Sequence, residues 1–277
     1  MLTNHYKRVF LFYYTACFIV CYALLYGSGS LLHQTSPLFA VNKLDLSLHI
    51  LLLTSLGDLV IMHSWLQAVL DATYLLLPLL LLWAVLRQST YQYFFAFLNV
   101  VYNIGYSLLL TTLSAMSTQW FIGFIFIPLL FMVRKDLSFY YAFHCLRYLF
   151  LIVFFTAGLW KIRAGGLLNL EQMSAILLKQ HGSLLVSAPE NWYASMILSL
   201  VRHPGMAYIL YLLGAIAELF FVVGLFTRNM DRLLLLILML FIAFNIAIMK
   251  INYFPWVAFG FLFWYSKLNE PLLQDTN

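Results

Sequence analysis

Three ionisable side chains that could carry out or tune a proton transfer interrupt apolar stretches of this chain: Arg147, Lys161 and Glu218. A lysine in an apolar pocket can lose its proton and act as a base, because burial disfavours the charged ammonium. Gly158 and Lys161 follow Arg147 by eleven and fourteen residues, which places all three within about 40° of one helical face. We therefore expect one helix to present them to the interior of a bundle, with Lys161 as the candidate catalytic base. The alternative is that Lys161 marks the end of that helix and reaches water.

Glu218 is placed deep in its apolar segment, about 17 Å from the start of that segment. Because a charge in hydrocarbon is costly, its carboxyl group must be neutral, paired or in contact with water. We expect Glu218 and Arg147 to tune Lys161 as the further catalytic residues. The alternative is structural, with Glu218 paired with Arg147 or bonded to a tyrosine. Asp71 lies on the second turn of another apolar segment, and we interpret it as structural.

The histidines and cysteines do not predict a metal site. The seven histidines include no pair four residues apart, and none has a cysteine or glutamate at the spacing of a metal site. Cys17 and Cys21 share a helical face, where packing is favoured over chelation. The three cysteines are also too few for a disulfide framework.

The composition places the chain in a membrane. Of its 277 residues, 64% are hydrophobic and 9% are charged, against roughly 45–50% and about 25% in soluble domains. The mean hydropathy is +0.91, which excludes a disordered chain. The net charge is +5, and the lysines and arginines are spread out with no run of three. This distribution argues against nucleic acid as a partner. The expected partner is the lipid bilayer.

Eight segments resemble helices that cross a bilayer, which need about 20 mostly apolar residues. They are Val9–Tyr26, Leu66–Leu86, Tyr91–Leu113, Gln119–Val133, His144–Trp160, Met206–Phe226, Arg232–Met249 and Tyr253–Tyr265. We interpret the first as a retained helix rather than a cleaved signal peptide, because it is longer than the about 7–15 residues of a signal core. The sequence predicts an all-α polytopic transmembrane helix bundle, with about eight spanning helices plus one or two interfacial helices. Residues 1–277 are expected to form a single domain.

The orientation depends on the ambiguous segment Leu46–Met62, which we interpret as partly embedded or packed on the bundle. If it crosses the bilayer, every later helix is inverted. With the N-terminus inside, the lysines and arginines show a weak bias toward the inner face. The inner positions are Lys7, Arg8, Arg87, Arg134, Lys135, Arg228, Arg232 and Lys267, and the outer ones are Lys43, Lys161, Arg163, Lys179, Arg202 and Lys250. We expect a multi-pass protein of a bacterial inner membrane.

The long connection Lys161–Gly205 is expected to carry structure of its own, as either a surface connector or a cover for an active site. Its apolar residues fall on one helical face, as in a helix that lies at the membrane interface. They are Leu167, Leu170, Met173 and Leu177. Trp192 and Tyr193 suit the level of the lipid headgroups.

The segment Val153–Ile162 (VFFTAGLWKI) resembles the Tyr-Phe-x-Ala-Gly-x-x-Lys-Leu segment of the vitamin K-dependent gamma-carboxylase-like family, also called the HTTM family. Further segments resemble the family in the same order. Glu218–Arg228 is similar to its acidic helix with a basic end, and Asn245–Val257 to its next helix pair. Ser47–His49 is similar to a Ser-Leu-His early in the domain.

The resemblance implies that Lys161 is the base that starts the oxygenation of a quinol, vitamin K hydroquinone, and that the product then takes a proton from a substrate glutamate. Ile242 stands where the family has a histidine, and Gly165-Gly166 where it has a tryptophan. The alternative function is therefore a non-catalytic membrane partner or maturation factor for another protein or peptide. Ser266–Asn277 follow the last predicted span, so we expect a short bacterial-type member without the family's soluble C-terminal region.

Overall fold

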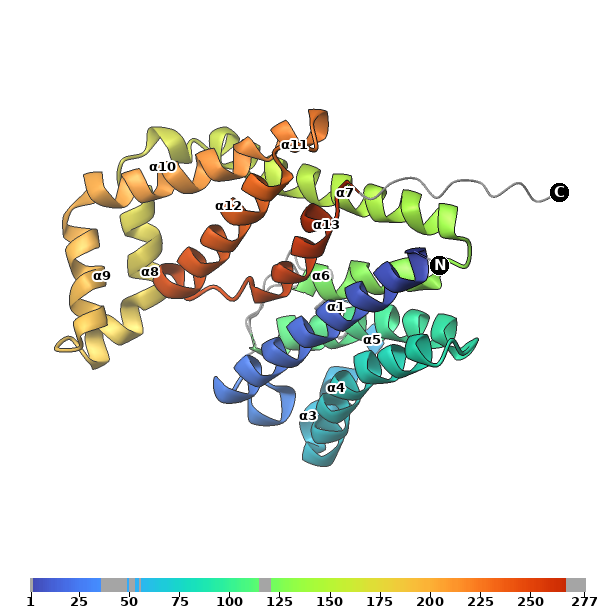
Figure 1. The fold of residues 1–277 in the computed structure, drawn as a ribbon. Helices are drawn as coiled ribbons and strands as arrows, with labels where there is room; N and C mark the ends of the chain where they lie inside the picture. The colour runs from blue at the N-terminus through green and yellow to red at the C-terminus, as the bar shows by residue number, and fades with distance from the viewer. Residues whose placement is uncertain (1, 36–48, 50–52, 55, 115–120, 268–277) are drawn as a thin grey trace. The chain divides into compact units, whose positions relative to one another are not determined.

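The computed structural model describes residues 2–35, 49, 53–54, 56–114 and 121–267, and in these ranges every regular element is helical (Figure 1). The elements are α1 (Leu2–Gly27), η1 (Leu32–Gln34), α3 (Leu56–Met62), α4 (Ser64–Leu86), α5 (Tyr91–Ser114), α6 (Ile122–Phe126), η3 (Ile127–Met132), α7 (Asp136–Arg163), η4 (Gly166–Leu168), α8 (Gln172–Ser187), α9 (Trp192–Arg202), α10 (Pro204–Phe220), α11 (Val223–Phe226), α12 (Asp231–Phe244), η5 (Asn245–Met249), η6 (Phe254–Phe259) and α13 (Gly260–Trp264).

Six of these helical segments are long and apolar enough to cross a membrane, which confirms the predicted all-α, multi-pass membrane class. They are His5–Gln34, Ser64–Leu86, Tyr91–Thr111, Asp136–Arg163, Pro204–Phe226 and Asp231–Met249. Two other predicted spans coincide with shorter apolar helices, Ile122–Met132 and Phe254–Trp264. Eleven residues of α-helix rise about 16 Å, well short of a hydrocarbon core of about 30 Å. Seven of the seventeen residues of Leu46–Met62 lie outside the described residues, and its last seven form α3.

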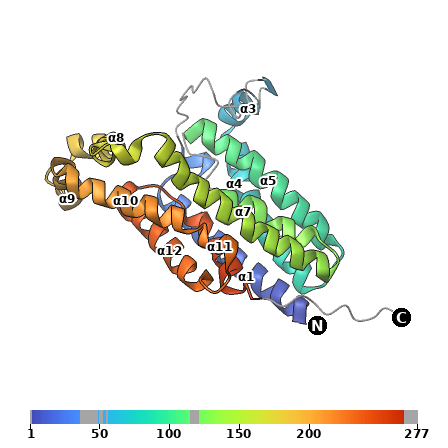
Figure 2. The ribbon, with the colours of Figure 1, turned by 90° about the horizontal axis from the view of Figure 1, so that it is seen from above.

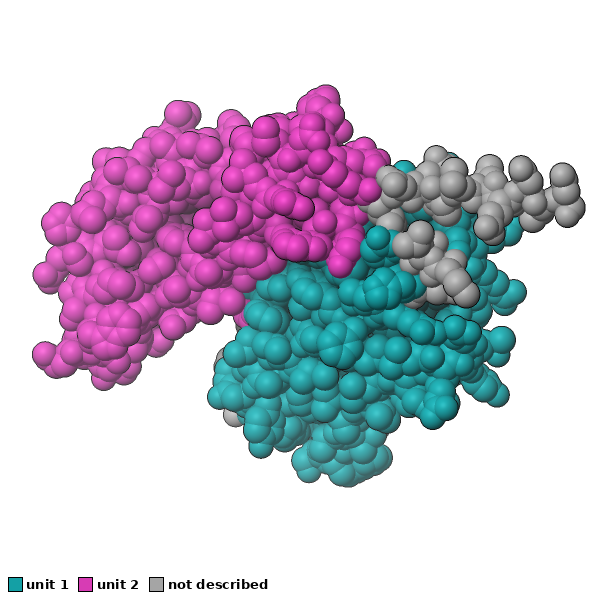
Figure 3. Space-filling view, viewed as in Figure 1, with its two compact units in different colours: residues 1–144, 253–261, 268–277 teal, residues 145–252, 262–267 magenta. Residues whose placement is uncertain are grey.

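The chain divides into two compact units, coloured separately in Figure 3. Unit 1 comprises residues 1–144, 253–261 and 268–277, and unit 2 comprises residues 145–252 and 262–267. Helix α7 is continuous through the boundary. The single domain expected from the sequence stays a prediction.

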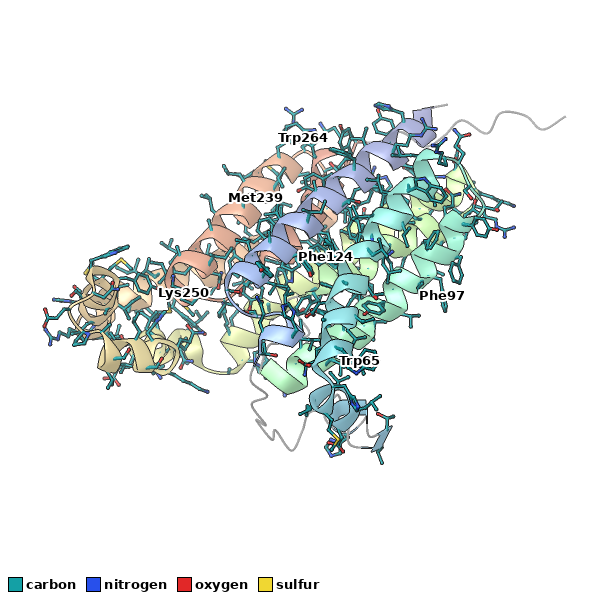
Figure 4. The ribbon with its side chains drawn as sticks, turned by 90° about the horizontal axis from the view of Figure 1, so that it is seen from below. Trp65, Phe97, Phe124, Met239, Lys250 and Trp264 are labelled. Atoms are coloured by element: carbon teal, nitrogen blue, oxygen red, sulfur yellow. The ribbon has the colours of Figure 1, made fainter. Side chains whose placement is uncertain are left out.

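Unit 1 is packed largely by aromatic rings. Helices α4 and α5 lie side by side as an antiparallel pair in both ribbon views (Figures 1 and 2). Tyr74 of α4 stacks on Tyr106 of α5, with ring centroids 3.9 Å apart. Phe124 of α6 is fully buried against α1, whereas Phe97 of α5 is exposed (Figure 4 labels both). The exposed phenylalanine suits a helix whose outer face meets lipid.

In unit 2, two glycines allow α7 to pack closely against α10 and α11 (Figure 2). A Cβ atom at Gly158 would lie 2.9 Å from Leu219 Cγ and 3.1 Å from the Leu219 backbone nitrogen. A Cβ atom at Gly224 would lie 2.6 Å from a methyl carbon of Leu151. Leu151 and Gly158 of α7 lie against Gly224 and Leu219 respectively. Helix α7 therefore runs antiparallel to the chain through α10 and α11.

The connection after Lys161 carries structure, as expected, in the form of the helices α8 and α9. Met173 and Leu177 are buried in a common core with Ile197 of α9. Leu167 packs against this core, but Leu170 is exposed, so the predicted face holds only in part. The reason is that a turn precedes α8, and the continuous helix assumed in the periodicity argument is absent there.

Two side chains of the α8–α9 hairpin contact carbonyl groups of the π-helical segment η5, which follows α12. Tyr193 Oη donates to the carbonyl oxygens of Ala247 and Ile248 at 3.0 and 3.2 Å. His181 Nε2 lies 2.8 Å from the same Ile248 oxygen. Lys250, labelled in Figure 4, follows in the left-handed region with φ +53° and places its ammonium 4.5 Å from the Tyr193 ring centre. Burial raises the pKa of Tyr193, which keeps the hydroxyl a donor.

Several tryptophans are exposed near the ends of apolar helices. Trp65 and Trp83 lie near the two ends of α4, Trp160 near the end of α7, and Trp264 at the end of α13 (Figure 4 labels Trp65 and Trp264). Trp192, expected at the headgroup level, is also exposed. Indole rings prefer the interface between lipid and water, so this distribution is typical of a membrane protein.

Candidate functional site

The structure brings two of the three candidate residues together. Lys161, in the last turn of α7, donates from Nζ to Oε1 of Glu218 in α10 over 2.9 Å. The Lys161 side chain is 26% exposed and that of Glu218 is 6% exposed. The ammonium also lies 5.4 Å from the centre of the Tyr211 ring. The site therefore has a cation that the surroundings can reach and a carboxylate that they cannot.

The second carboxylate oxygen of Glu218 makes this pair a candidate for proton transfer. Oε2 is buried and has no hydrogen-bond partner among the described residues. A buried polar atom without a partner is costly in a membrane protein. Such an atom is available to accept a hydrogen bond or a proton, so the pair can exchange a proton without first losing another contact.

Close backbone approaches fix the geometry around this pair. Gly158 lies one turn before Lys161 and permits the contact with Leu219, next to Glu218. A Cβ atom at Gly166 would clash with the hydroxyl of Tyr211. Tyr208 Oη donates to the carbonyl oxygen of Leu167 at 2.6 Å. The first half of α10 is thereby held against the segment that follows α7.

Arg147 belongs to a separate, fully buried ion pair. Its Nε donates to Asp231 Oδ2 at 2.9 Å, its Nη2 lies 2.5 Å from Asp231 Oδ1, and Nη2 also donates to the Gly224 carbonyl oxygen at 2.9 Å. The interpretation that Glu218 pairs with Arg147 is wrong. The two basic groups lie about 21 Å apart along α7, and Glu218 lies beside the later one.

The expected stripe of Arg147, Gly158 and Lys161 nevertheless exists, because all three contact the chain from Glu218 to Asp231. The residue that the sequence reasoning missed is Asp231. The predicted span began one residue later, at Arg232, and left this carboxylate outside. A signal was present, since an acid in the first turn of a very apolar helix is placed to complement the helix dipole and to meet a buried cation.

Among the residues that the structure describes, no group of three histidine, cysteine, aspartate or glutamate side chains could hold a metal ion. Cys17 and Cys21 are both buried on α1. Comparison of the chain with protein-family models, with curated proteins and with solved structures finds no match in any of the three. Membership of the carboxylase-like family therefore stays a prediction.

Proposed function

We propose that this chain is a multi-pass membrane enzyme of the gamma-carboxylase-like type, which takes a proton from a lipophilic quinol at the Lys161–Glu218 pair. The observation that carries the proposal is the pair itself: a partly exposed lysine bound to a buried carboxylate that keeps one oxygen unpartnered. Positioned proton-transfer groups of this kind are typical of general acid–base catalysis.

The chain's own residues account for each proton. In the resting pair the ammonium and the carboxylate neutralise each other. Transfer of one proton from Lys161 Nζ to Glu218 gives two uncharged groups, which low polarity favours over two ions. The free amine then accepts the proton of the quinol hydroxyl. The new ammonium faces the Tyr211 ring, which stabilises it through a cation–π contact.

The test uses protein reconstituted in lipid with reduced vitamin K and oxygen, and quinone epoxide is measured by mass spectrometry. We expect the wild-type protein to form epoxide and Lys161→Met to form at least about 100-fold less, the usual effect of removing a general base. Glu218→Gln should also lose activity, because the amide cannot take the lysine proton. Lys179→Met, which alters an exposed lysine on α8, is the matched control and should be unaffected. Epoxide formation that survives Lys161→Met in a folded protein would exclude the base assignment.

A non-catalytic partner or maturation factor is the second candidate function. Exposed apolar side chains near and within the α8–α9 hairpin favour it, since such residues suit an interface with a peptide or lipid. They are Leu168, Val186 and Trp192. The absence of epoxide, together with a crosslinked complex recovered from native membranes that tolerates Lys161→Met, would favour this function over catalysis.

We also propose eight crossings with the N-terminus on the cytoplasmic side of a bacterial inner membrane. Lys7 near the start of α1 binds Asp136 at the start of α7, with Nζ and Oδ1 2.9 Å apart. Arg134 lies 5.0 Å from the ring centre of Tyr93, near the start of α5. Three membrane-length helices, α1, α4 and α5, separate Lys7 from this point. These contacts support a return of the chain to the side of Lys7 through the segment that contains α6 and η3, which is shorter than an ordinary span.

Two further contacts support this topology. His33 after α1 binds Asp71 in α4, so the end of α1 and the start of α4 are expected to lie on one side of the membrane. Phe10 stacks on Phe261, and Tyr13 Oη donates to the Val257 carbonyl oxygen at 2.6 Å. The chain from Val257 to Phe261 thus runs antiparallel to α1, as expected for the last of eight crossings.

Single cysteines introduced into a chain without its three native cysteines test the topology. We expect Thr90→Cys and Lys135→Cys to react with an impermeant maleimide from the same side, and His63→Cys from the other. All three positions are exposed. Lys135→Cys is expected on the side of Thr90→Cys because, in the proposed topology, α6 and η3 together return the chain to the side of Lys7. If Lys135→Cys reacts from the side of His63→Cys, the segment dips without crossing and the eight-span topology is wrong.

A further inference from the structure

A histidine, an aspartate and a tyrosine from three separate segments of unit 1 converge where α1 ends. Nδ1 of His33 lies 2.5 Å from Oδ2 of Asp71 in α4. Tyr106 of α5 donates its hydroxyl proton to the other oxygen, Oδ1. Thirty-eight and thirty-five residues separate these partners of Asp71 from it in the chain. The proposed quinol reaction uses none of them.

The carboxylate of Asp71 is fully bonded and cannot turn. The backbone nitrogens of Leu32 and His33 donate to its two oxygens at 3.2 and 3.0 Å, and its side chain is 2% exposed. Because backbone N–H groups can only donate, both oxygens act as acceptors. The aspartate therefore holds the imidazole ring and Tyr106 in one fixed arrangement.

This arrangement decides which nitrogen of His33 is free to react. A carboxylate accepts hydrogen bonds, so Nδ1 carries the proton, and Nε2 of the neutral ring is an acceptor with a lone pair. The His33 side chain is 35% exposed, so a ligand can reach the ring. When Nε2 takes a proton, Asp71 stabilises the resulting imidazolium, as a buried aspartate does for a catalytic histidine.

We propose that His33, Asp71 and Tyr106 form a second proton-transfer site, for amphiphilic ligands that carry an acidic phenolic hydroxyl. The ligand's O–H bond breaks, its proton forms a bond with Nε2, and the phenolate remains bound to the imidazolium. Its bonding electrons stay on the phenolate oxygen, so no oxidant or reductant takes part.

Neighbouring side chains define the class of ligand. The ring of Tyr74 stacks on Tyr106, and the ring centre of Tyr22 lies 6.4 Å from that of Tyr74. Tyr74 and Tyr106 are buried, whereas Tyr22 is partly exposed, so an aromatic headgroup can extend this series by stacking on Tyr22. Tyr26 and Leu24, on the last turns of α1, are exposed, which suits a ligand with an apolar part held at the membrane surface. The Tyr74 hydroxyl is buried and has no hydrogen-bond partner among the described residues, which provides a further polar atom beside the site.

The test uses 4-nitrophenol, whose phenolate form is coloured, with the full chain in nanodiscs at a pH where the free probe is mostly protonated. We expect phenolate absorbance that saturates with the probe concentration, above the signal of empty nanodiscs. His33→Gln removes the acceptor and should weaken binding by roughly tenfold or more, the usual effect of losing a charge-assisted hydrogen bond. Asp71→Asn should do the same, because the amide cannot stabilise the imidazolium.

Two control variants distinguish binding of the probe at His33 from binding elsewhere on the protein. His203→Gln changes an exposed histidine whose Nδ1 lies 2.8 Å from the Ser199 carbonyl oxygen rather than from a carboxylate, and should leave binding unchanged. Lys161→Met removes proton transfer at the proposed quinol site and should retain the part of the signal that depends on His33, so the two sites are tested separately. An unsaturable signal in the wild-type protein, or equal binding by folded His33→Gln, overturns the proposal. His33 is partly exposed, so this variant tests the site even if Asp71→Asn does not fold.

Discussion

Replacement of Arg147 by methionine will lower the free energy of unfolding by about 3–5 kcal/mol, the cost of leaving one member of a buried ion pair without its partner. Both side chains of the Arg147–Asp231 pair are at most 2% exposed. Methionine fills much of the arginine's volume but leaves the Asp231 carboxylate and the Gly224 carbonyl oxygen without their donor. Unfolding by heat or by denaturing detergent, followed by circular dichroism, measures the loss.

The double variant Arg147→Met with Asp231→Leu is the decisive comparison. Because it removes both charges, it should recover most of the stability. Lys7→Met is the matched control: the Lys7–Asp136 pair has side chains 15% and 45% exposed, and its loss should cost less than about 1 kcal/mol. A single variant Arg147→Met as stable as Lys7→Met would contradict the buried pair.

Alanine at Gly123 will destabilise the protein by about 1–3 kcal/mol through overpacking. A Cβ atom there would clash with the carbonyl oxygen of Pro255 and lie 3.1 Å from the Pro255 carbonyl carbon. Both atoms belong to the backbone of η6, so no rotamer change can relieve the clash. The same unfolding assay measures the effect.

The same change from glycine to alanine at Gly105 is not expected to destabilise the protein. Gly105 lies inside α5, and a Cβ atom there has no atom within 4 Å. Alanine is the better helix former by about 1 kcal/mol, so this variant should be equal to or more stable than the wild-type protein. If both alanine variants behave alike, α6 does not approach η6 as closely as the structure has it.

The sequence predicted the local properties of this protein well, because hydropathy and helical period belong to single segments. Hydropathy alone indicates the apolar segments around α1, α4, α5, α7, α10 and α12. The stripe of Arg147, Gly158 and Lys161 followed from the 100° rotation per residue of an α-helix. The two shorter helices were also located, although their lengths are below those of ordinary spans.

The pairing of charges could not be predicted in this way. Two cations on α7 face a chain segment with two carboxylates, and hydropathy does not say which meets which. The register of α7 against α10, set by Gly158 on Leu219, assigns Glu218 to Lys161 and leaves Arg147 to Asp231.

Residue types and their spacing within one helix are enough to specify the all-helical membrane class and the side chains able to do chemistry. The partners of those side chains, by contrast, follow from the packing of the helices. The bonds of Asp71 show why: its partners His33 and Tyr106 lie on other segments, 38 and 35 residues away in the chain. Contacts at such separations depend on how the helices pack, and no local pattern carries that information.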